Sequence, residues 1–251
     1  MKPLKIGLLG LSDPAPVPTQ LLSALHDIAD ITLSPILSVP SSPRQRAALW
    51  NAWMQEDYDY IFDVSGGNLS TLTLPYLDLE LYARTRTVFA GYSDLTPILN
   101  ALASRTGRPA LLCSAPLNVP ELLNWLAGRS QALFHTGVPF ASVMGGNIRC
   151  LLKLAGTPWW PDLQGKVLLL EANSGTPAQL ASMCAQLVNM GVFSQISALV
   201  LGQFTQCTNK TGRQVVEDTI ASMGASCPAV YHTDWIGHAP GSRAIWIGGS
   251  L

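Results

Sequence analysis

Short apolar runs alternate with stretches of helical periodicity over the first half of the chain. Five of these runs have the length of buried strands: 4–11, 31–37, 60–64, 87–90 and 109–113. Between them, residues 17–28 and 42–56 carry apolar side chains at helical spacing, and Ser42-Pro43 makes a favourable helix start. Strands that alternate with helices from the first residues predict an α/β fold with a mostly parallel sheet and helices on both faces.

The pattern becomes less regular after about residue 116. A helical stretch at 116–127 is followed by a segment, 128–139, that resembles a linker. Further strand-like and helical runs then alternate: 165–171, 176–190, 196–203, 212–223, 229–235 and 244–248. We therefore predict a Rossmann- or flavodoxin-like sheet over residues 1–130 and a smaller α/β domain over residues 131–251.

The strand at 87–90 leads directly into Gly91-Tyr92-Ser93-Asp94, and an apolar-periodic helix opens at Asp94. A strand, a sharp turn and a helix with Ser93 at the apex have the form of a nucleophile elbow, which exposes the serine oxygen. The alternative is a plain strand-to-helix turn in which Ser93 or Asp94 caps the helix. The turn departs from G-x-S-x-G, because Leu95, followed by Thr96, stands where that pattern has its last glycine.

Gly66-Gly67 follows the strand at 60–64, so it lies at the same sheet edge as Ser93. The pair could serve a turn alone, or it could let the backbone approach a ligand closely. In the second case the N–H groups of Gly67 and Asp94 would form an oxyanion hole.

Composition excludes several classes of protein. Hydrophobic residues make up 48% of the 251 positions and charged residues 12%, but no apolar run has the length of a membrane span. The net charge of −1 does not favour a nucleic acid polymer as partner. The five cysteines lack CxxC spacing and the four histidines lack metal-ligand spacing, so we expect reduced thiols and no metal. Without GxGxxG or a Walker motif we expect no cofactor, and without a signal peptide pattern we expect a cytoplasmic protein with no membrane attachment.

An ordered series of motifs resembles the LD-carboxypeptidase family of serine peptidases, which includes microcin C self-immunity peptidases. The motifs span nearly the whole chain: Gly66-Gly67-Asn68, Leu74-Pro75-Tyr76-Leu77-Asp78, 91–96, Gly145-Gly146-Asn147, Gly156-Thr157-Pro158, 165–171, 201–204 and Ile236-Gly237-His238. Carried onto this sequence, the resemblance implies a catalytic triad of Ser93, Glu171 and His238. It also implies that the backbone N–H groups of Gly67 and Asp94 are the oxyanion donors.

The resemblance leaves substrate choice open, because the chain departs from the family pattern near the predicted site. Asn68 stands where the family often has tyrosine, Ser65 where it often has arginine, and Ala239 follows His238 where glycine is common. We take Asn68 as a candidate substrate-binding residue.

Trp159 and Trp160 are further candidates for substrate binding, because an exposed indole can bind a planar or sugar-like group, although core packing also explains them. His135 and His232 compete with His238 for the role of the base.

The resemblance implies a small peptide or peptide conjugate as substrate, and a homodimer is compatible with it. One hypothesis is a carboxypeptidase that releases D-Ala from the L,D bond of murein tetrapeptide during cell-wall recycling. A second is an immunity peptidase that cleaves an amide in a peptide-nucleotide antibiotic, and a third is a catalytically idle relative that only binds a small ligand. A cysteine-dependent amidotransferase is disfavoured, because no cysteine lies at an elbow.

Overall fold

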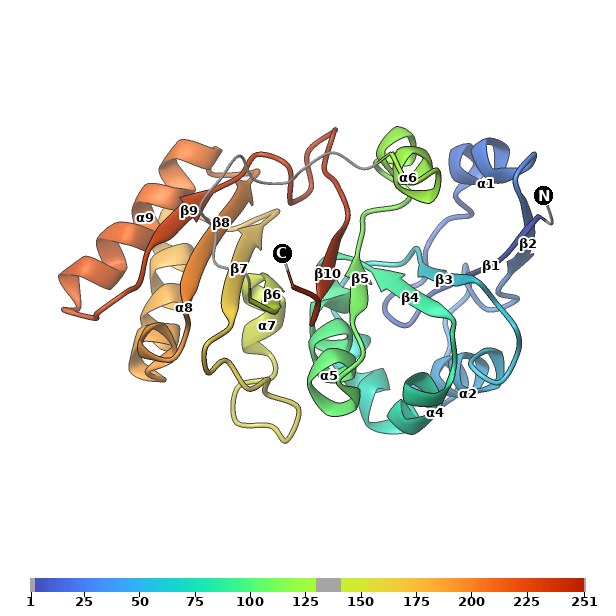
Figure 1. Ribbon diagram of the computed structural model, residues 1–251, viewed down its shortest axis with the longest axis horizontal. Coiled ribbons are helices and arrows are strands. Elements are labelled where there is room, and N and C mark those ends of the chain that lie inside the picture. Colours follow the sequence, from blue (N-terminus) through green and yellow to red (C-terminus); the bar gives the residue numbers. More distant parts are fainter. Residues whose placement is uncertain (1–2, 130–140, 251) are drawn as a thin grey trace.

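The computed structural model describes residues 3–129 and 141–250. Two sheets lie side by side along the long axis of the molecule, with the second half of the chain forming most of the left-hand layer in Figure 1. The architecture is the predicted α/β class with a mostly parallel first sheet and a smaller second sheet.

The first sheet has six strands in the order β10-β5-β4-β3-β1-β2. Their bounds are β1 (Leu4–Leu9), β2 (Ala29–Leu33), β3 (Tyr60–Asp63), β4 (Val88–Gly91), β5 (Ala110–Leu112) and β10 (Ile245–Ile247). Strands β1 to β5 are parallel, and β10 pairs with β5 in the antiparallel direction. The order 2-1-3-4-5 is that of flavodoxin-like sheets, in which ligands bind at the carboxyl ends of the strands.

Helices cover both faces of the first sheet. On one face lie α1 (Thr19–Leu25) and α6 (Val119–Leu126), whose buried leucines join the cluster around Ile6 and Phe62. The other face packs against α2 (Pro43–Trp53), α3 (Ser70–Thr73), α4 (Leu79–Arg84) and α5 (Thr96–Thr106). Helix α2 begins where its sequence predicts, because Ser42 and Gln45 form a capping box ahead of Pro43.

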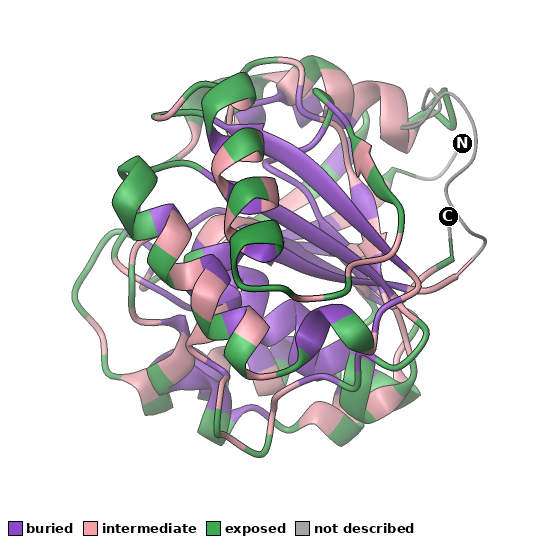
Figure 2. Ribbon diagram, turned by 90° about the vertical axis from the view of Figure 1, so that its left-hand side faces the viewer, coloured by how far each residue is buried: buried purple, intermediate pink, exposed green. Residues whose placement is uncertain are grey.

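The second sheet is wholly parallel, in the order β6-β7-β8-β9. Its strands are β6 (Val143–Asn147), β7 (Val167–Ala172), β8 (Ala198–Phe204) and β9 (Val230–His232). The short helix α7 (Ile148–Leu152) follows β6, while α8 (Pro177–Asn189) and α9 (Asn209–Ser222) cover the side turned away from the first sheet. Figure 2 shows the exposed outer faces of these two helices in front of the buried strands.

The last strand joins the two halves of the molecule. After β10 pairs with β5, the chain reaches the start of β6, where the N–H of Val143 donates to the carbonyl of Gly249 at 2.9 Å and the N–H of Gly248 to the carbonyl of Val143 at 2.7 Å. A single apolar cluster also runs from α2 and α5 to both faces of β7. The strand that ends the described chain therefore crosses the domain boundary predicted at residue 130.

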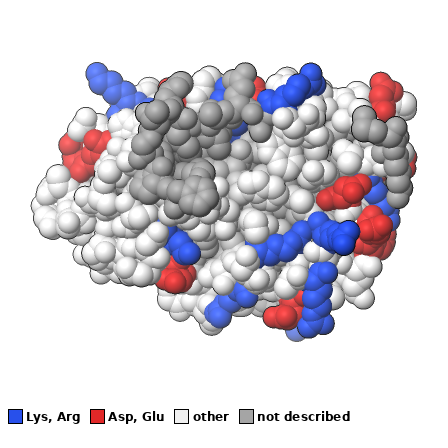
Figure 3. Space-filling view, viewed as in Figure 1, with Lys and Arg blue, Asp and Glu red and all other residues white. Residues whose placement is uncertain are grey.

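Charged side chains of both signs are interspersed on the face shown in Figure 3, with broad uncharged areas between them. No helix among the described residues combines the length and the apolar character needed to cross a bilayer.

Candidate active site

Ser93 lies in the turn between β4 and α5 with a φ of 54°, one of two non-glycine residues with a positive φ in the described chain. A short 3-10 helix, Ser93–Leu95, precedes α5. Gly91 permits this sharp turn, because a Cβ at that position would lie 2.9 Å from the side chain of Leu95. A left-handed serine between a strand and a helix is the backbone signature of a nucleophile elbow.

The helix that begins at this turn fixes the second sheet against the first. Asn100 on α5 donates from Nδ2 to the carbonyl of Gly145 and accepts from its N–H, both at 2.8 Å. Thr96 Oγ1 donates to the carbonyl of Ser93 at 2.7 Å and accepts from the N–H of Asn147 at 3.1 Å. Since Asn147 pairs with Glu171 in the register of β6 and β7, these bonds set the position of Glu171 relative to Ser93.

Glu171 and His238 form a buried pair. Nδ1 of His238 lies 2.8 Å from Oε2 of Glu171, and the two side chains are 6% and 2% exposed. A carboxylate can only accept a hydrogen bond, so it selects the tautomer that carries its proton on Nδ1. That tautomer leaves Nε2 free to accept a proton.

Gln203 on β8 anchors the loop that carries His238. Its N–H donates to the carbonyl of Ile236 at 2.8 Å, and its Nε2 donates to the carbonyl of Asp234 at 2.6 Å. Its Oε1 accepts from the N–H of Ala239 at 2.7 Å. Gln203 is 3% exposed, so its amide contacts hold the loop on both sides of His238 in a fixed place.

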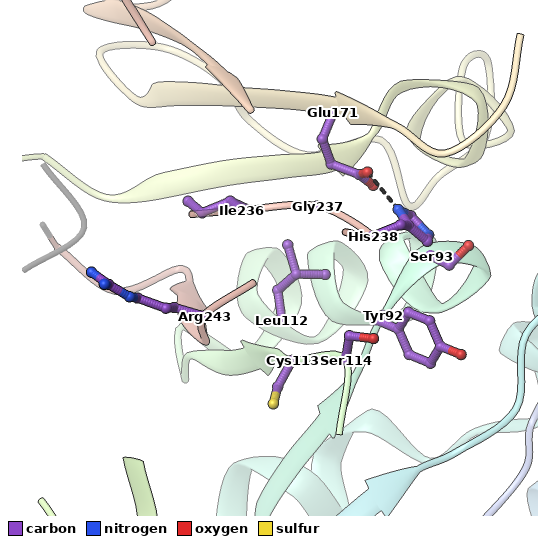
Figure 4. A pocket seen from close by; sticks show the side chains of 10 residues that line it. All are labelled: Tyr92, Ser93, Leu112, Cys113, Ser114, Glu171, Ile236, Gly237, His238 and Arg243. Atoms are coloured by element: carbon purple, nitrogen blue, oxygen red, sulfur yellow. Dashed lines mark hydrogen bonds and ion pairs between the residues drawn. The ribbon is translucent and has the colours of Figure 1, made fainter. Parts of the chain in front are cut away.

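Ser93, Glu171 and His238 line one small pocket (Figure 4). The ring of Tyr92 tilts against that of His238 at 5.9 Å between centroids, so Tyr92 lines the pocket. Nε2 of His238 is buried and has no hydrogen-bond partner within the described ranges, and Ser93 lies beside the ring in Figure 4. A buried nitrogen without a hydrogen-bond partner lowers the stability of the protein. A hydrogen bond from a serine hydroxyl to Nε2 would remove this penalty and would prepare the transfer of the serine proton.

The Gly66-Gly67 loop lies between the ends of β1 and β3 and the turn at Ser93. The N–H of Asp13 donates to the carbonyl of Gly66 at 3.1 Å, which fixes the plane of the Gly66–Gly67 peptide. Gly67 has a φ of 116°, and a Cβ there would collide with the Asp13 carboxylate, so only glycine fits. Because the N–H and C=O of a trans peptide point in opposite directions, the Gly67 N–H points away from Asp13.

A buried carboxylate binds the segment that leads into the Gly66-Gly67 loop. Asp63 at the end of β3 accepts from the N–H of Leu11 at 2.7 Å, and from the N–H and Oγ of Ser65 at 2.8 and 2.6 Å. Burial raises the pKa of Asp63 to about 7, because desolvation penalises its charged form more than these hydrogen bonds stabilise it.

The folded protein should therefore hold the Asp63 proton more tightly than the unfolded chain does. The stability that the folded protein gains from binding this proton is fully present below about pH 4. It is lost as the pH rises towards 7. Replacing Asp63 by Asn removes this titration, so the wild-type free energy of unfolding minus that of Asp63→Asn should fall by on the order of 4 kcal/mol at most across this range. Urea unfolding at several pH values measures it, with exposed Asp57→Asn as the control. A difference that stays constant from pH 4 to 8 would contradict the assignment.

The structure does not bring every predicted residue to this pocket. Trp159 and Trp160 are partly buried against the core, in the loop that enters β7 at its amino end, whereas Glu171 lies near the carboxyl end. His232 lies on β9 and pairs with Glu217 at 2.6 Å, outside the pocket of Ser93. His135 falls outside the described residues. No group of three or more His, Cys, Asp or Glu side chains in the described ranges is arranged to hold a metal ion.

Two profiles of one family match most of the chain. That of the LD-carboxypeptidase N-terminal domain matches residues 28–112, and that of the LD-carboxypeptidase C-terminal domain matches residues 141–251. The chain belongs to the LD-carboxypeptidase family. Ser93 lies within the first matched range, and Glu171 lies within the second.

Two curated relatives indicate the range of activities in this family. The microcin C7 self-immunity protein of Escherichia coli is 24% identical over 208 residues, which cover 64% of this chain and 60% of that protein. The murein tetrapeptide carboxypeptidase of Pseudomonas aeruginosa is 28% identical over 223 residues, covering 78% and 72%. The chain spans about 60% of the length of the first curated relatives it matches.

Solved structures of the family share the fold. The microcin C7 self-immunity protein in complex with glutamyl sulfamoyl guanosine superposes with a TM-score of 0.82 at 17% identity, covering 98% of this chain and 91% of that one. At this identity the likeness shows a shared fold.

Proposed function

We propose that this protein is a serine peptidase of the LD-carboxypeptidase type, with Ser93 as nucleophile, His238 as base and Glu171 as the acid that orients the base. The observation that carries the proposal is the buried Glu171–His238 pair at 2.8 Å in the pocket that Ser93 also lines. A serine needs a neighbouring base, and a base needs a partner that fixes its tautomer. This pocket contains all three groups.

The proposed reaction uses these groups in two steps. Ser93 Oγ attacks the amide carbon while Nε2 of His238 takes its proton, and the N–H groups of Gly67 and Asp94 stabilise the oxyanion. The carbon–nitrogen bond then breaks as His238 returns the proton to the leaving amine. Water attacks the acyl-enzyme in the same way, with His238 again as base, and releases Ser93.

Murein tetrapeptide is the substrate that we propose first, with D-Ala as the leaving amine. The pocket beside the triad is small, with about 10 Å³ open to the centres of water molecules, which is room for about one water. A space of this size can hold the water that attacks the acyl-enzyme, and most of a short peptide would bind outside it. Since all five cysteines are free, we place the reaction in the reducing cytoplasm.

A second candidate is the cleavage of an aminoacyl-nucleotide amide. It is favoured by one observation: the family's microcin C7 self-immunity protein has been solved with glutamyl sulfamoyl guanosine and aspartyl sulfamoyl adenosine. Such a substrate would also present a carbonyl carbon to Ser93, but its leaving group would be much larger than D-Ala.

The test is hydrolysis by the purified chain, followed by mass spectrometry. We expect D-Ala release from murein tetrapeptide and none from the matched peptide that ends in L-Ala. Cleavage of an aminoacyl-adenylate analogue alone would favour the second candidate. If neither is cleaved and a fluorophosphonate fails to label Ser93, the protein is an idle relative and the proposal is wrong.

A further inference from the structure

A lysine from the second half of the chain reaches the turn that carries the nucleophile. Lys153 follows α7, and its Nζ forms an ion pair with Oδ1 of Asp94. The same Nζ donates to the carbonyl of Asn68 at 3.3 Å. One ammonium group thus contacts both segments whose backbone N–H groups would form the oxyanion hole.

The Asp94 carboxylate is the centre of this contact. It is completely buried, and its Oδ2 accepts from Ser12 Oγ at 2.6 Å and from the N–H of Ser70 at 3.0 Å. The Oγ of Ser70 in turn donates to the backbone carbonyl of Asp94. The carboxylate therefore ties the residue after the nucleophile to the segment that follows Gly67.

A buried carboxylate is tolerated when a cation and hydrogen bonds compensate its charge. Within the described residues, Lys153 is the basic side chain that pairs with Asp94. Without that ammonium, the buried carboxylate would lose the cation that compensates its charge. The hydrogen bonds from Ser12 and Ser70 to Asp94 would then rearrange, and we expect the Asp94 peptide and its N–H to move with them.

Arg149, one helical turn before Lys153, holds the other side of the loop. Its Nη1 donates to Oδ1 of Asn68 at 2.5 Å, and its Nη2 lies 3.5 Å from the carbonyl of Gly67. Residues four apart share one helix face, so both cations approach the loop from the same side. Arg149 is exposed, whereas the Lys153 side chain is only 22% exposed, so Lys153 has the stronger hold.

We propose that Lys153 is a positioning residue that holds the Gly67 and Asp94 N–H groups in register across the junction between the two sheets. It does not touch the substrate. It acts by neutralising Asp94 and binding the Asn68 carbonyl, which keeps the oxyanion donors at a fixed separation. This inference rests on the proposed function, because it assigns Lys153 a part in the same reaction.

The experiment compares Lys153→Met with Lys153→Arg, and uses exposed Lys210→Met as the matched control. Two readouts are kcat and KM for the peptide, and the rate at which a fluorophosphonate labels Ser93. We expect Lys153→Met to lower kcat and the labelling rate about 10- to 100-fold, because misplaced oxyanion donors act on the transition state, with KM changed less than about threefold. Lys153→Arg should restore most of both rates, and Lys210→Met should match the wild type.

A double variant, Lys153→Met with Asp94→Asn, keeps the inference testable if Lys153→Met alone fails to fold. It removes the uncompensated charge, so it should fold, yet remain slower than the wild type. Wild-type kcat and labelling in folded Lys153→Met or in the double variant would overturn the inference while leaving the proposed function intact. An unlabelled and inactive wild type would overturn the proposed function, and the inference with it.

Discussion

Replacing Ser93 by Ala should abolish hydrolysis while leaving the protein folded. The variant lacks the nucleophile, so His238 has no serine proton to accept. The rate of hydrolysis should therefore fall by about 10⁴- to 10⁶-fold. Its stability should hardly change, since Ser93 Oγ has no hydrogen-bond partner among the residues that the structure describes. Steady-state kinetics and thermal unfolding of the same sample measure both quantities. More than about a tenth of the wild-type activity would remove Ser93 from its assigned role.

Ser93→Gly is the matched control for this result. The left-handed φ of 54° costs a non-glycine residue roughly 1–2 kcal/mol, and glycine adopts it freely. We expect this variant to be as inactive as Ser93→Ala but more stable than it. A less stable Ser93→Gly would mean that the turn is not strained.

His238→Ala should reduce hydrolysis about as severely as loss of the nucleophile, by roughly 10⁴- to 10⁶-fold in kcat, since these residues act as a unit. Nε2 of His238 is the buried acceptor in the pocket with Ser93, and Nδ1 is committed to Glu171. His232→Ala is the matched control, because His232 also pairs with a glutamate but lies elsewhere on β9. Kinetics of both variants with the peptide substrate decide between them. An inactive His232→Ala beside an active His238→Ala would reverse the assignment.

Glu171→Gln refines this result. The amide keeps the size of the side chain but cannot stabilise an imidazolium, so kcat should fall by about 10²- to 10⁴-fold with KM little changed. An unaffected variant would show that the activity of His238 does not depend on the Glu171 carboxylate.

The sequence predicted the parallel sheet well, because that prediction depends on local patterns. The apolar run at 60–64 and the capping box at Ser42 act over a few residues, and the structure contains both elements close to the predicted limits. The sharp strand-to-helix turn at Ser93 was also predictable, because Gly91 and the helix start are close to Ser93 in the chain.

Contacts between distant segments could not be predicted in this way. Nothing local says that residues 245–247 pair with β5 rather than with the second sheet. The ion pair between Lys153 and Asp94 also joins two halves of the chain, and no local pattern pairs residues that lie 59 positions apart. The proposed triad could be named because a family resemblance, and not a spacing, links Ser93, Glu171 and His238.

The place of β10 has a consequence for how the protein folds during synthesis. Strand β5 leaves the ribosome early, but the segment that pairs with its free edge, Ile245–Ile247, is made only after the whole second sheet. Until then the sheet that bears Ser93 presents an unpaired apolar edge, of the kind that recruits other chains into aggregates. The nascent chain therefore remains exposed to misassembly until the second sheet has been translated, and β10 then covers the free edge of β5.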